Sequence, residues 1–192
     1  MPSFDFEKDH LFENERANIR PLTPDDLELL GPIAYQNKDL LAYSPSQIHT
    51  KELLSNYIHA ALQARANQQR YPFIIFDKAK NQCAGSTSFG NVSNKDRRLE
   101  IGWTWIGPEF QGTGLNKACK DLLMTYAFET LDFERVEFRI DSRNIKSRRA
   151  VEKLGAQFEG ELRSHTLMSD GFRRNTVYYG ILKSEWKKQQ NS

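Results

Sequence analysis

Hydrophobic and polar residues alternate along several segments of the chain, with the period of two that is typical of half-buried strands. Residues 98–106 and 134–141 both alternate, and the run PFIIF at 72–76 is apolar throughout, as in a strand buried on both faces. In 98–106 we expect one side of the strand to be apolar, formed by Leu99, Ile101, Trp103 and Trp105. The strands expected are 11–22 (as one strand or two short ones), 72–76, 83–90, 98–106, 134–141, 157–168 and 173–182. Asp170-Gly171 predicts a tight hairpin between the last two.

Other segments repeat their apolar residues at helical spacing. Residues 23–36 and 50–69 follow this pattern, with Thr23 and Thr50 as the expected N-caps. A third helix follows a glycine-containing turn, and its apolar face would consist of Leu115, Ala118, Cys119, Leu122, Leu123 and Tyr126. Residues 144–155 predict a short basic helix that Gly155 closes, whereas 38–50 is expected to be a loop. The start before His10 and the tail at 187–192 are expected to be frayed.

The order of these elements is β, α, α, β, β, β, α, β, α, β, β. A meander of antiparallel strands followed by a β-α-β crossover predicts a mixed, mostly antiparallel sheet. We therefore expect an α+β fold with about seven strands and about four helices.

Composition and charge narrow the class of protein. The 192 residues are 39% hydrophobic and 27% charged, which fits one soluble globular domain over 1–192. The net charge of +2 is too small to indicate nucleic acid as the main partner. No apolar run resembles a secretory signal or a membrane span, so no membrane partner is expected. Cys83 and Cys119 are far apart, which favours reduced thiols in the cytoplasm over a disulfide or a metal site.

The turn QGTGLNK, residues 111–117, joins an expected strand to an expected helix. Free N–H groups at a helix start bind phosphate when no side chain blocks the approach, and Gly112 and Gly114 would leave it open. A turn that requires a positive φ would equally explain one glycine. The mononucleotide P-loop pattern does not match, because Leu115 follows Gly114, and the dinucleotide fingerprint fails because Lys117 occupies its third glycine position.

The segment FQGTGLNKACKDLL, residues 110–123, is similar to the pyrophosphate loop of the GNAT-type N-acetyltransferases, whose pattern is Gln/Arg-x-x-Gly-x-Gly/Ala. Gln111 and Gly114 match, and Asn116 departs from the final Gly/Ala, which would tighten the helix start around the ligand. EIGWTWIGPEF before it and NIKSRRAVEKLGAQFEGELR after it resemble the flanking strand and the Asn-x-x-Ser helix of the ribosomal-protein N-acetyltransferase-like branch. The resemblance covers roughly 16–185.

The resemblance implies a GNAT-like fold whose sheet is splayed at the centre, and acetyl-CoA as cosubstrate. The pyrophosphate would bind the N–H groups of residues 112–117, and a backbone N–H near Ile106 would polarise the thioester carbonyl. The basic cluster of Lys146, Arg148, Arg149 and Lys153 is either a solvated helix face or a phosphate-binding surface. The implied cofactor-binding residues are Trp105, Ile106, Gln111, Gly112, Thr113, Gly114, Leu115, Asn116, Lys117, Asn144, Ser147 and Arg149.

The resemblance also implies direct attack of an amine on the thioester in a ternary complex. Many relatives place a proton-donating tyrosine four residues after the Ser of Asn-x-x-Ser, but this chain has Val151 there, so Ser147 is the candidate acid. Glu100, on the strand that leads to the site, is one candidate base and could otherwise be a carboxylate in a salt bridge. His165 is the alternative base, or a packed or solvent-facing strand residue.

The acceptor is expected between the 38–50 loop, the end of strand 98–106 and the last hairpin. The few acids near the loop, essentially Asp39 and Glu52, do not suit a polycation. We therefore expect the α-amine of a peptide or protein N-terminus. Polyamines, aminoglycosides and amino acids remain alternatives, as do a non-catalytic acyl-CoA-binding module and assembly as a homodimer.

Overall fold

A computed structural model describes residues 2–190, and its centre is one mixed sheet with the strand order β1-β2-β3-β4-β5-β6-β8-β7. The opening segment forms two short strands, so the sheet has eight strands where about seven were expected. The β-rich meander and the mixed sheet are confirmed. The strands are β1 (Phe12–Glu13), β2 (Ala17–Pro21), β3 (Arg70–Asp77), β4 (Gln82–Ser93), β5 (Arg98–Ile106), β6 (Arg135–Asp141), β7 (Gln157–Leu167) and β8 (Arg173–Leu182).

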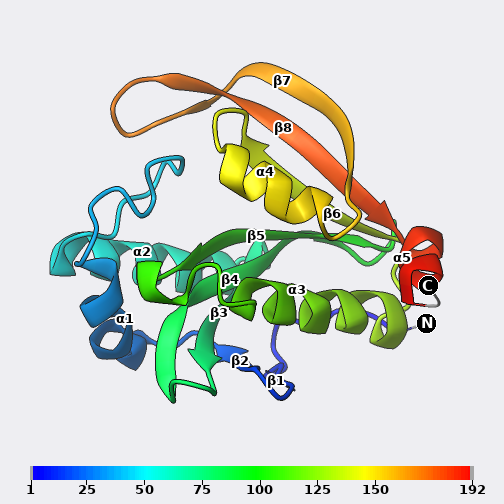
Figure 1. The fold of residues 1–192 in the computed structure, drawn as a ribbon, viewed down its shortest axis with the longest axis horizontal. Helices are drawn as coiled ribbons and strands as arrows, with labels where there is room; N and C mark the ends of the chain where they lie inside the picture. Colours follow the sequence, from blue (N-terminus) through cyan, green and yellow to red (C-terminus); the bar gives the residue numbers. More distant parts are fainter. Residues whose placement is uncertain (1, 191–192) are drawn as a thin grey trace.

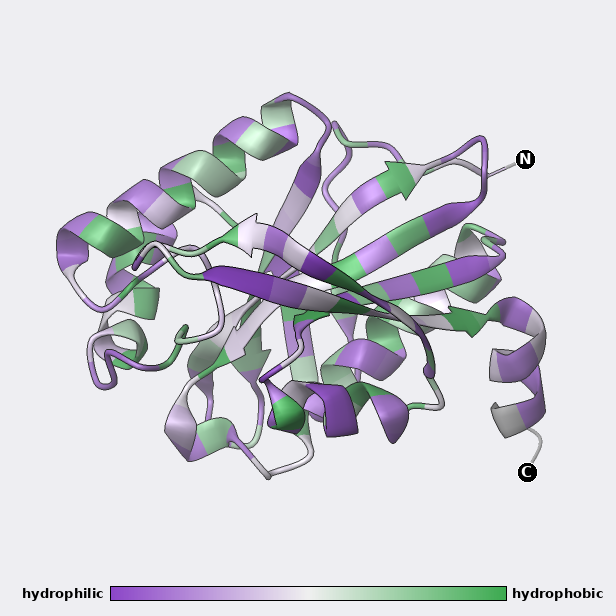
Figure 2. Ribbon diagram, turned by 90° about the horizontal axis from the view of Figure 1, so that it is seen from above, coloured by the Kyte–Doolittle hydropathy of each residue, from purple (hydrophilic) through white to green (hydrophobic). Residues whose placement is uncertain are grey.

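Helices lie on both sides of this sheet, and the colours of Figure 2 show hydrophilic and hydrophobic residues mixed along both helices and strands. The expected helices all form, and within residues 2–190 a fifth α-helix follows β8. Thr50 caps its helix as expected, because its hydroxyl accepts from the Leu53 N–H at 3.2 Å. The helices are η1 (Pro24–Asp26), α1 (Leu27–Ala34), α2 (Lys51–Ala66), η2 (Pro108–Phe110), α3 (Leu115–Thr125), the π-helical η3 (Tyr126–Thr130), α4 (Ile145–Glu152) and α5 (Lys183–Gln190).

Within residues 2–190 the segments near both ends form defined contacts, although the sequence pattern predicted frayed ends. Phe4 is 3% exposed and stacks on His10, and the Tyr71 hydroxyl donates to the Lys8 carbonyl at 2.7 Å. At the other end α5 continues to Gln190 and buries Trp186, while residues 191–192 lie outside the described range. Isolated aromatic residues among charged ones give no periodic signal, so their long-range packing was missed.

The sheet divides where β5 meets β6, as the resemblance implied. These two parallel strands pair only from Arg98 to Glu100 on β5 and from Arg135 to Glu137 on β6. Beyond these pairs β5 continues along β4, and β6 continues along β8. Figure 1 shows the result: α4, β6, β7 and β8 lie together in the upper half, and β1 to β5 lie below with α3. A gap therefore opens between two strands at the centre of the sheet.

A β-bulge in β5 contradicts the simple alternation expected for residues 98–106. Ser86 pairs with Trp105 and Ser88 with Gly102, so two residues of β5 oppose one of β4. Trp103 takes a φ of +51° and is 40% exposed rather than in the core. Glu100, expected on the polar side, is only 4% exposed. The bulge takes Trp103 out of the core while Leu99, Ile101 and Trp105 stay buried as expected, and a bulge leaves no mark in the hydropathy pattern.

The state of the two cysteines and the lengths of the helices bear on the remaining expectations from the sequence. Cys83 and Cys119 are free and buried, and burial raises the pKa of each thiol to about 12. Both thiols are therefore protonated and unreactive at neutral pH. None of the helices within residues 2–190 is both long and apolar enough to cross a bilayer. A cytoplasmic location stays a prediction.

Candidate active site

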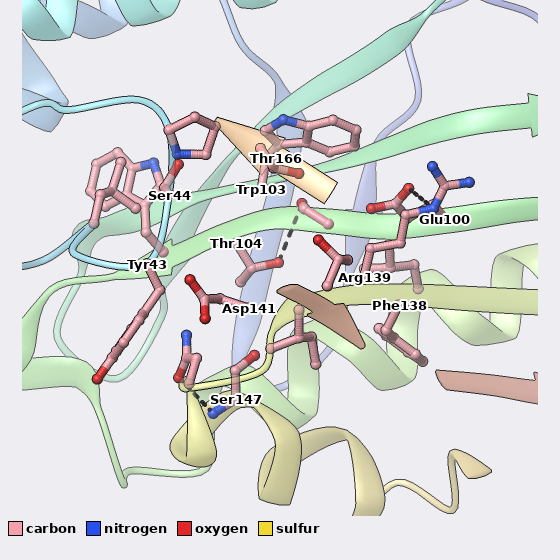
Figure 3. Close-up of a pocket in the computed structure, with 18 of the residues that line it drawn as sticks. Tyr43, Ser44, Glu100, Trp103, Thr104, Phe138, Arg139, Asp141, Ser147 and Thr166 are labelled. Carbon is pink, nitrogen blue, oxygen red and sulfur yellow. Dashed lines mark hydrogen bonds and ion pairs between the residues drawn. The ribbon is translucent and has the colours of Figure 1, made fainter. Parts of the chain in front are cut away.

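A cavity of about 370 Å³ lies at the gap between β5 and β6. Most of its walls come from three segments: the chain between α1 and α2, the β5 and β6 strands with α4, and the β7–β8 hairpin. Tyr57 of α2, Asn91 of β4 and Lys120 of α3 complete the lining. The three segments are those between which the sequence predicted an acceptor. Figure 3 shows the Glu100–Arg139 pair on one side of this space and Tyr43 and Ser147 on the other. All three candidate catalytic residues, Glu100, Ser147 and His165, line the cavity.

Glu100 enters the cavity from β5, just where the two strands separate. Its Oε2 accepts from the Asn91 amide at 2.6 Å and lies 3.2 Å from Nε of Arg139. Burial raises the pKa of this carboxyl above its usual value, although Arg139 and Asn91 act in the opposite direction. Glu100 is thus both a salt-bridge partner and a carboxylate at the cavity wall, so neither interpretation from the sequence excludes the other.

Asp141, which the sequence analysis did not single out, is the second carboxylate of the cavity. It ends β6, is buried, and accepts from Nε and Nη2 of Arg143 at 3.0 and 2.7 Å. Burial acts to raise the Asp141 pKa, but the hydrogen bonds and charge of Arg143 outweigh it and the pKa is lowered. Asp39 and Glu52, the acids expected near the acceptor, are exposed and do not line the cavity.

Arg174 of β8 is a further cavity residue that the sequence analysis missed. Its Nη1 donates to the Tyr43 carbonyl at 2.7 Å, which fixes the chain between α1 and α2 against the hairpin. Its Nε is buried and has no hydrogen-bond partner. Burial lowers the pKa of Arg174, against the attraction of Asp141 and Glu100. Its position depends on the pairing of β8 with β7, where Arg174 lies opposite Thr166, and only the tertiary fold defines that pairing.

The Asn-x-x-Ser element has a clear local cause. Asn144 is the N-cap of α4, and its side-chain oxygen accepts from the Ser147 N–H at 3.0 Å. This cap places Ser147 in the first turn of α4 with its side chain at the cavity. Among the described residues no hydrogen bond engages the Ser147 hydroxyl, so the hydroxyl is available to a ligand. Asn144 lines the same wall.

His165 lies in an irregular part of β7. Leu162 pairs with Thr176 and Thr166 with Arg174, so the strand bulges around His165. The ring is solvent-exposed, and its Nδ1 lies 3.1 Å from the Thr176 hydroxyl. His165 therefore reaches the cavity from its open side, whereas Glu100 is buried within the wall.

The glycine turn has the geometry that phosphate binding requires. Gly112 and Gly114 have φ values of +74° and +87°, and a Cβ at either position would meet no atom within 4 Å. The positive φ that one alternative from the sequence required is confirmed, and the space in front of the loop is open, as the phosphate alternative requires. Gly114 caps α3, whose first intrahelical bond runs from the Ala118 N–H to the Gly114 carbonyl at 3.0 Å. The preceding N–H groups point out of the helix start.

Several side chains of the loop have structural partners. The Gln111 amide donates to the Ile106 carbonyl at 2.8 Å and its oxygen accepts from Lys146, so Gln111 joins β5, the loop and α4. The Thr113 hydroxyl donates to the Phe110 carbonyl at 2.7 Å, and Lys117 pairs with Asp121 at 2.6 Å. These contacts shape the loop and engage the side chains of Gln111, Thr113 and Lys117 within the protein.

The other expected cofactor residues differ in their exposure. Leu115 is fully buried, so only its backbone could contact a ligand, and Asn116 has a buried Oδ1 without a partner. Trp105 is buried at the cavity wall with its Nε1 unpaired, whereas Ile106 does not line the cavity. In the basic cluster, Arg148 donates to the Tyr179 hydroxyl at 3.1 Å, and Arg149 and Lys153 are exposed. Among residues 2–190 no group of His, Cys, Asp and Glu residues has the arrangement of a metal site.

The chain matches the family model of the acetyltransferase (GNAT) domain over residues 16–157. It is 32% identical over 182 residues to "Putative ribosomal N-acetyltransferase YdaF" of Bacillus subtilis, which covers 91% of this chain and 95% of that protein. It is 26% identical over 175 residues to the spermidine N(1)-acetyltransferase of Escherichia coli K12, with 88% of each chain covered. A crystal structure of a GCN5-related N-acetyltransferase from Brucella melitensis superposes with a TM-score of 0.88 at 23% identity, covering 100% of this chain and 86% of that one.

These matches extend over most of the chain and agree with the splayed sheet, the glycine loop and the capped Asn-x-x-Ser helix. The chain belongs to the GNAT acetyltransferase family and is an acetyl-CoA-dependent N-acetyltransferase.

Proposed function

We propose that the enzyme acetylates the α-amine at the N-terminus of a peptide or protein. The observation that carries the proposal is that both carboxylates of the cavity are already paired with arginines, Glu100 with Arg139 and Asp141 with Arg143. A polyamine carries several charges and would need unpaired carboxylates to offset its desolvation. An α-amine carries one charge and is partly neutral near pH 7.5. The similarity to the putative ribosomal N-acetyltransferase of Bacillus subtilis supports a protein acceptor. The similarity to the spermidine N(1)-acetyltransferase of Escherichia coli supports a polyamine instead.

The residues present fit acetyl-CoA, whose contribution to the reaction is an acetyl group activated as a thioester. The open glycines of the loop and the N–H groups at the start of α3 would hold its pyrophosphate. The gap between β5 and β6 would take the arm, with Trp105 at its wall. Gln111 fixes the loop to the end of β5 through its hydrogen bond to Ile106. Arg149 is exposed and could pair with a phosphate.

Two side chains would move the protons of the transfer. The acceptor nitrogen forms a bond to the carbonyl carbon, and the carbon–sulfur bond then breaks. Glu100 would take the proton that the amine loses, through a water, and Ser147 Oγ would give a proton to the departing sulfur. His165 would take the place of Glu100 if the amine enters from the open side. The raised pKa of Glu100 suits a base better than an ordinary surface carboxylate would.

A competition experiment tests the acceptor class. With acetyl-CoA limiting, a short peptide library and spermidine are offered together at equal concentration, and products are identified by mass spectrometry. We expect peptides acetylated at the α-amine to dominate over acetylspermidine and over acetylated free lysine, because the paired acids leave no site for a second cation. Acetylspermidine as the main product would reject the peptide acceptor but would leave the acetyl-CoA-dependent activity intact.

Glu100→Gln tests the base. We expect kcat to fall about tenfold, since an α-amine with a pKa near 8 needs only partial assistance. In the wild type the rate contributed by an ionised Glu100 is present above its pKa and lost as the pH falls through it. That pKa is raised, so the loss begins at a higher pH than for an ordinary glutamate. Glu100→Gln should remove this limb of the pH–rate profile, and His165→Ala should leave it in place. The reverse pattern would make His165 the base.

A further inference from the structure

Lys120 is a buried cation at the cavity that the proposed reaction does not use. It lies on α3, is 5% exposed, and contributes to the cavity wall. Its Nζ lies 3.4 Å from the Thr104 hydroxyl of β5 and 5.6 Å from the centre of the Phe138 ring of β6. Thr104 and Phe138 stand on the two strands that separate, beyond the last pair at Glu100 and Glu137. The ammonium group therefore lies at the gap itself.

The ammonium is incompletely paired. It has three N–H donors, and its one hydrogen bond is the long contact to Thr104, whose hydroxyl also bonds Thr87 at 2.8 Å. Among residues 2–190 no carboxylate forms an ion pair with Lys120. Burial of a charge without an anion is unfavourable, and it lowers the pKa of Lys120 to about 8. The donors that remain can be satisfied by acceptor atoms of a ligand in the cavity.

The position of Lys120 indicates which part of a ligand it meets. Lys120 lies about 9 Å along α3 from Gly114, at a rise of about 1.5 Å per residue. Its Nζ contacts Thr104 and Phe138 at the gap and no residue of the glycine loop, so the part of the ligand nearest to it is the arm that runs from the phosphates into the gap. The acceptor atoms of that arm are all neutral, and apart from one hydroxyl they are the carbonyl oxygens of its amides and of the thioester. We propose that Lys120 Nζ donates a hydrogen bond, through the gap between β5 and β6, to a carbonyl oxygen of the acyl-pantetheine arm of acetyl-CoA.

This inference rests on the proposed binding of acetyl-CoA in the gap, and it makes Lys120 a binding residue for the donor. Calorimetry with two ligands separates the contributions of the arm and of the phosphates to the affinity. The ligands are acetyl-CoA and 3′-phospho-ADP, which carries the same phosphates without the arm. We expect Lys120→Met to weaken acetyl-CoA binding about tenfold, the loss of one hydrogen bond to a charged donor. The affinity for 3′-phospho-ADP should stay within about twofold. Lys187→Met, at an exposed lysine of α5, is the matched control and should change neither.

Proton linkage gives a second readout. A carbonyl partner stabilises the charged amine and raises its pKa, so the wild type should take up a fraction of a proton on binding acetyl-CoA at pH 8. Titrations in two buffers of different ionisation enthalpy measure this uptake. It should vanish in Lys120→Met and also in Lys120→Gln, which keeps a neutral donor and should lose only part of the affinity. The titration with 3′-phospho-ADP subtracts any contribution of the phosphates.

The outcomes separate the two proposals. Unchanged acetyl-CoA affinity in Lys120→Met, or proton release by the wild type, would overturn the role of Lys120 and leave acetyl-CoA binding intact. Free CoA is titrated as a third ligand. If Lys120→Met weakens the binding of free CoA but not of acetyl-CoA, the role is also overturned, because Lys120 would then pair with the thiolate and not with a carbonyl. No binding of either ligand to the wild type would overturn the proposed placement of acetyl-CoA together with this inference. Thermal melting of each variant checks that it is folded.

Discussion

Gly114→Val is expected to weaken acetyl-CoA binding by about a hundredfold or more while the protein stays folded. Gly114 caps α3 with a φ of +87°, and the space that its Cβ would occupy contains no protein atom within 4 Å. A valine side chain would project into that space and keep a phosphate from the N–H groups of the helix start. Loss of two charge-assisted hydrogen bonds, each about 1.5–3 kcal/mol, accounts for a change of this size.

The same substitution also strains the backbone, and Gly171 provides the matched control. Gly171 has a φ of +84° in the β7–β8 turn and, like Gly114, no atom within 4 Å of its Cβ position. Gly171→Val should therefore suffer a similar backbone cost, about 1–2 kcal/mol, without touching the loop. Calorimetry measures the affinity of each variant for acetyl-CoA, and the rise in melting temperature that acetyl-CoA causes checks that affinity independently. Equal affinity in Gly114→Val and wild type, or equal loss in both variants, would contradict a phosphate site at Gly114.

Sequence reasoning works at this site where the cause of the structure is local. The positive φ of Gly112 and Gly114 follows from the residue type, and the cap of Asn144 on Ser147 spans only three positions. Glu100 was singled out because it lies on the strand that, by the family resemblance, leads to the site, and it does line the cavity. The glycine turn and the helix cap are each encoded within a few neighbouring residues, so one sequence is enough to find them.

The features that were missed depend on side-chain pairs that the hydropathy pattern does not encode, whether the partners lie two residues apart, as Asp141 and Arg143 do, or far apart in the chain. Arg143 neutralises Asp141 and Arg139 pairs with Glu100, and it is these pairs that decide the charge of the cavity. Arg174 holds the Tyr43 carbonyl across 131 residues of sequence. A helical projection could have found Lys120, because it shares a face with the buried Leu123 and Ala127 and is the charged exception among them. The contacts of the Lys120 ammonium group with Thr104 and Phe138 could not be predicted from that projection.

Ser147→Ala is expected to lower kcat about a hundredfold and to leave the KM for acetyl-CoA nearly unchanged, as loss of a proton donor used only in the transition state would. The cap of α4 should survive, because Asn144 bonds the Ser147 backbone N–H and not its hydroxyl. Ser142→Ala is the matched control. It removes a serine hydroxyl from the same β6–α4 segment, at a position that does not line the cavity, and it should keep the wild-type kcat.

The pH dependence of the defect distinguishes a proton donor from a structural residue. A thiol with a pKa of about 8.5 leaves as a stable thiolate at higher pH, where a proton donor gives less advantage. The ratio of wild-type to Ser147→Ala kcat, measured with the same acceptor from pH 7 to 9.5, should therefore shrink above about pH 8.5. A residue that only positions α4 would give a ratio independent of pH. A constant ratio, or an unchanged kcat, would show that Ser147 is not the proton donor. The departing sulfur would then take its proton from solvent.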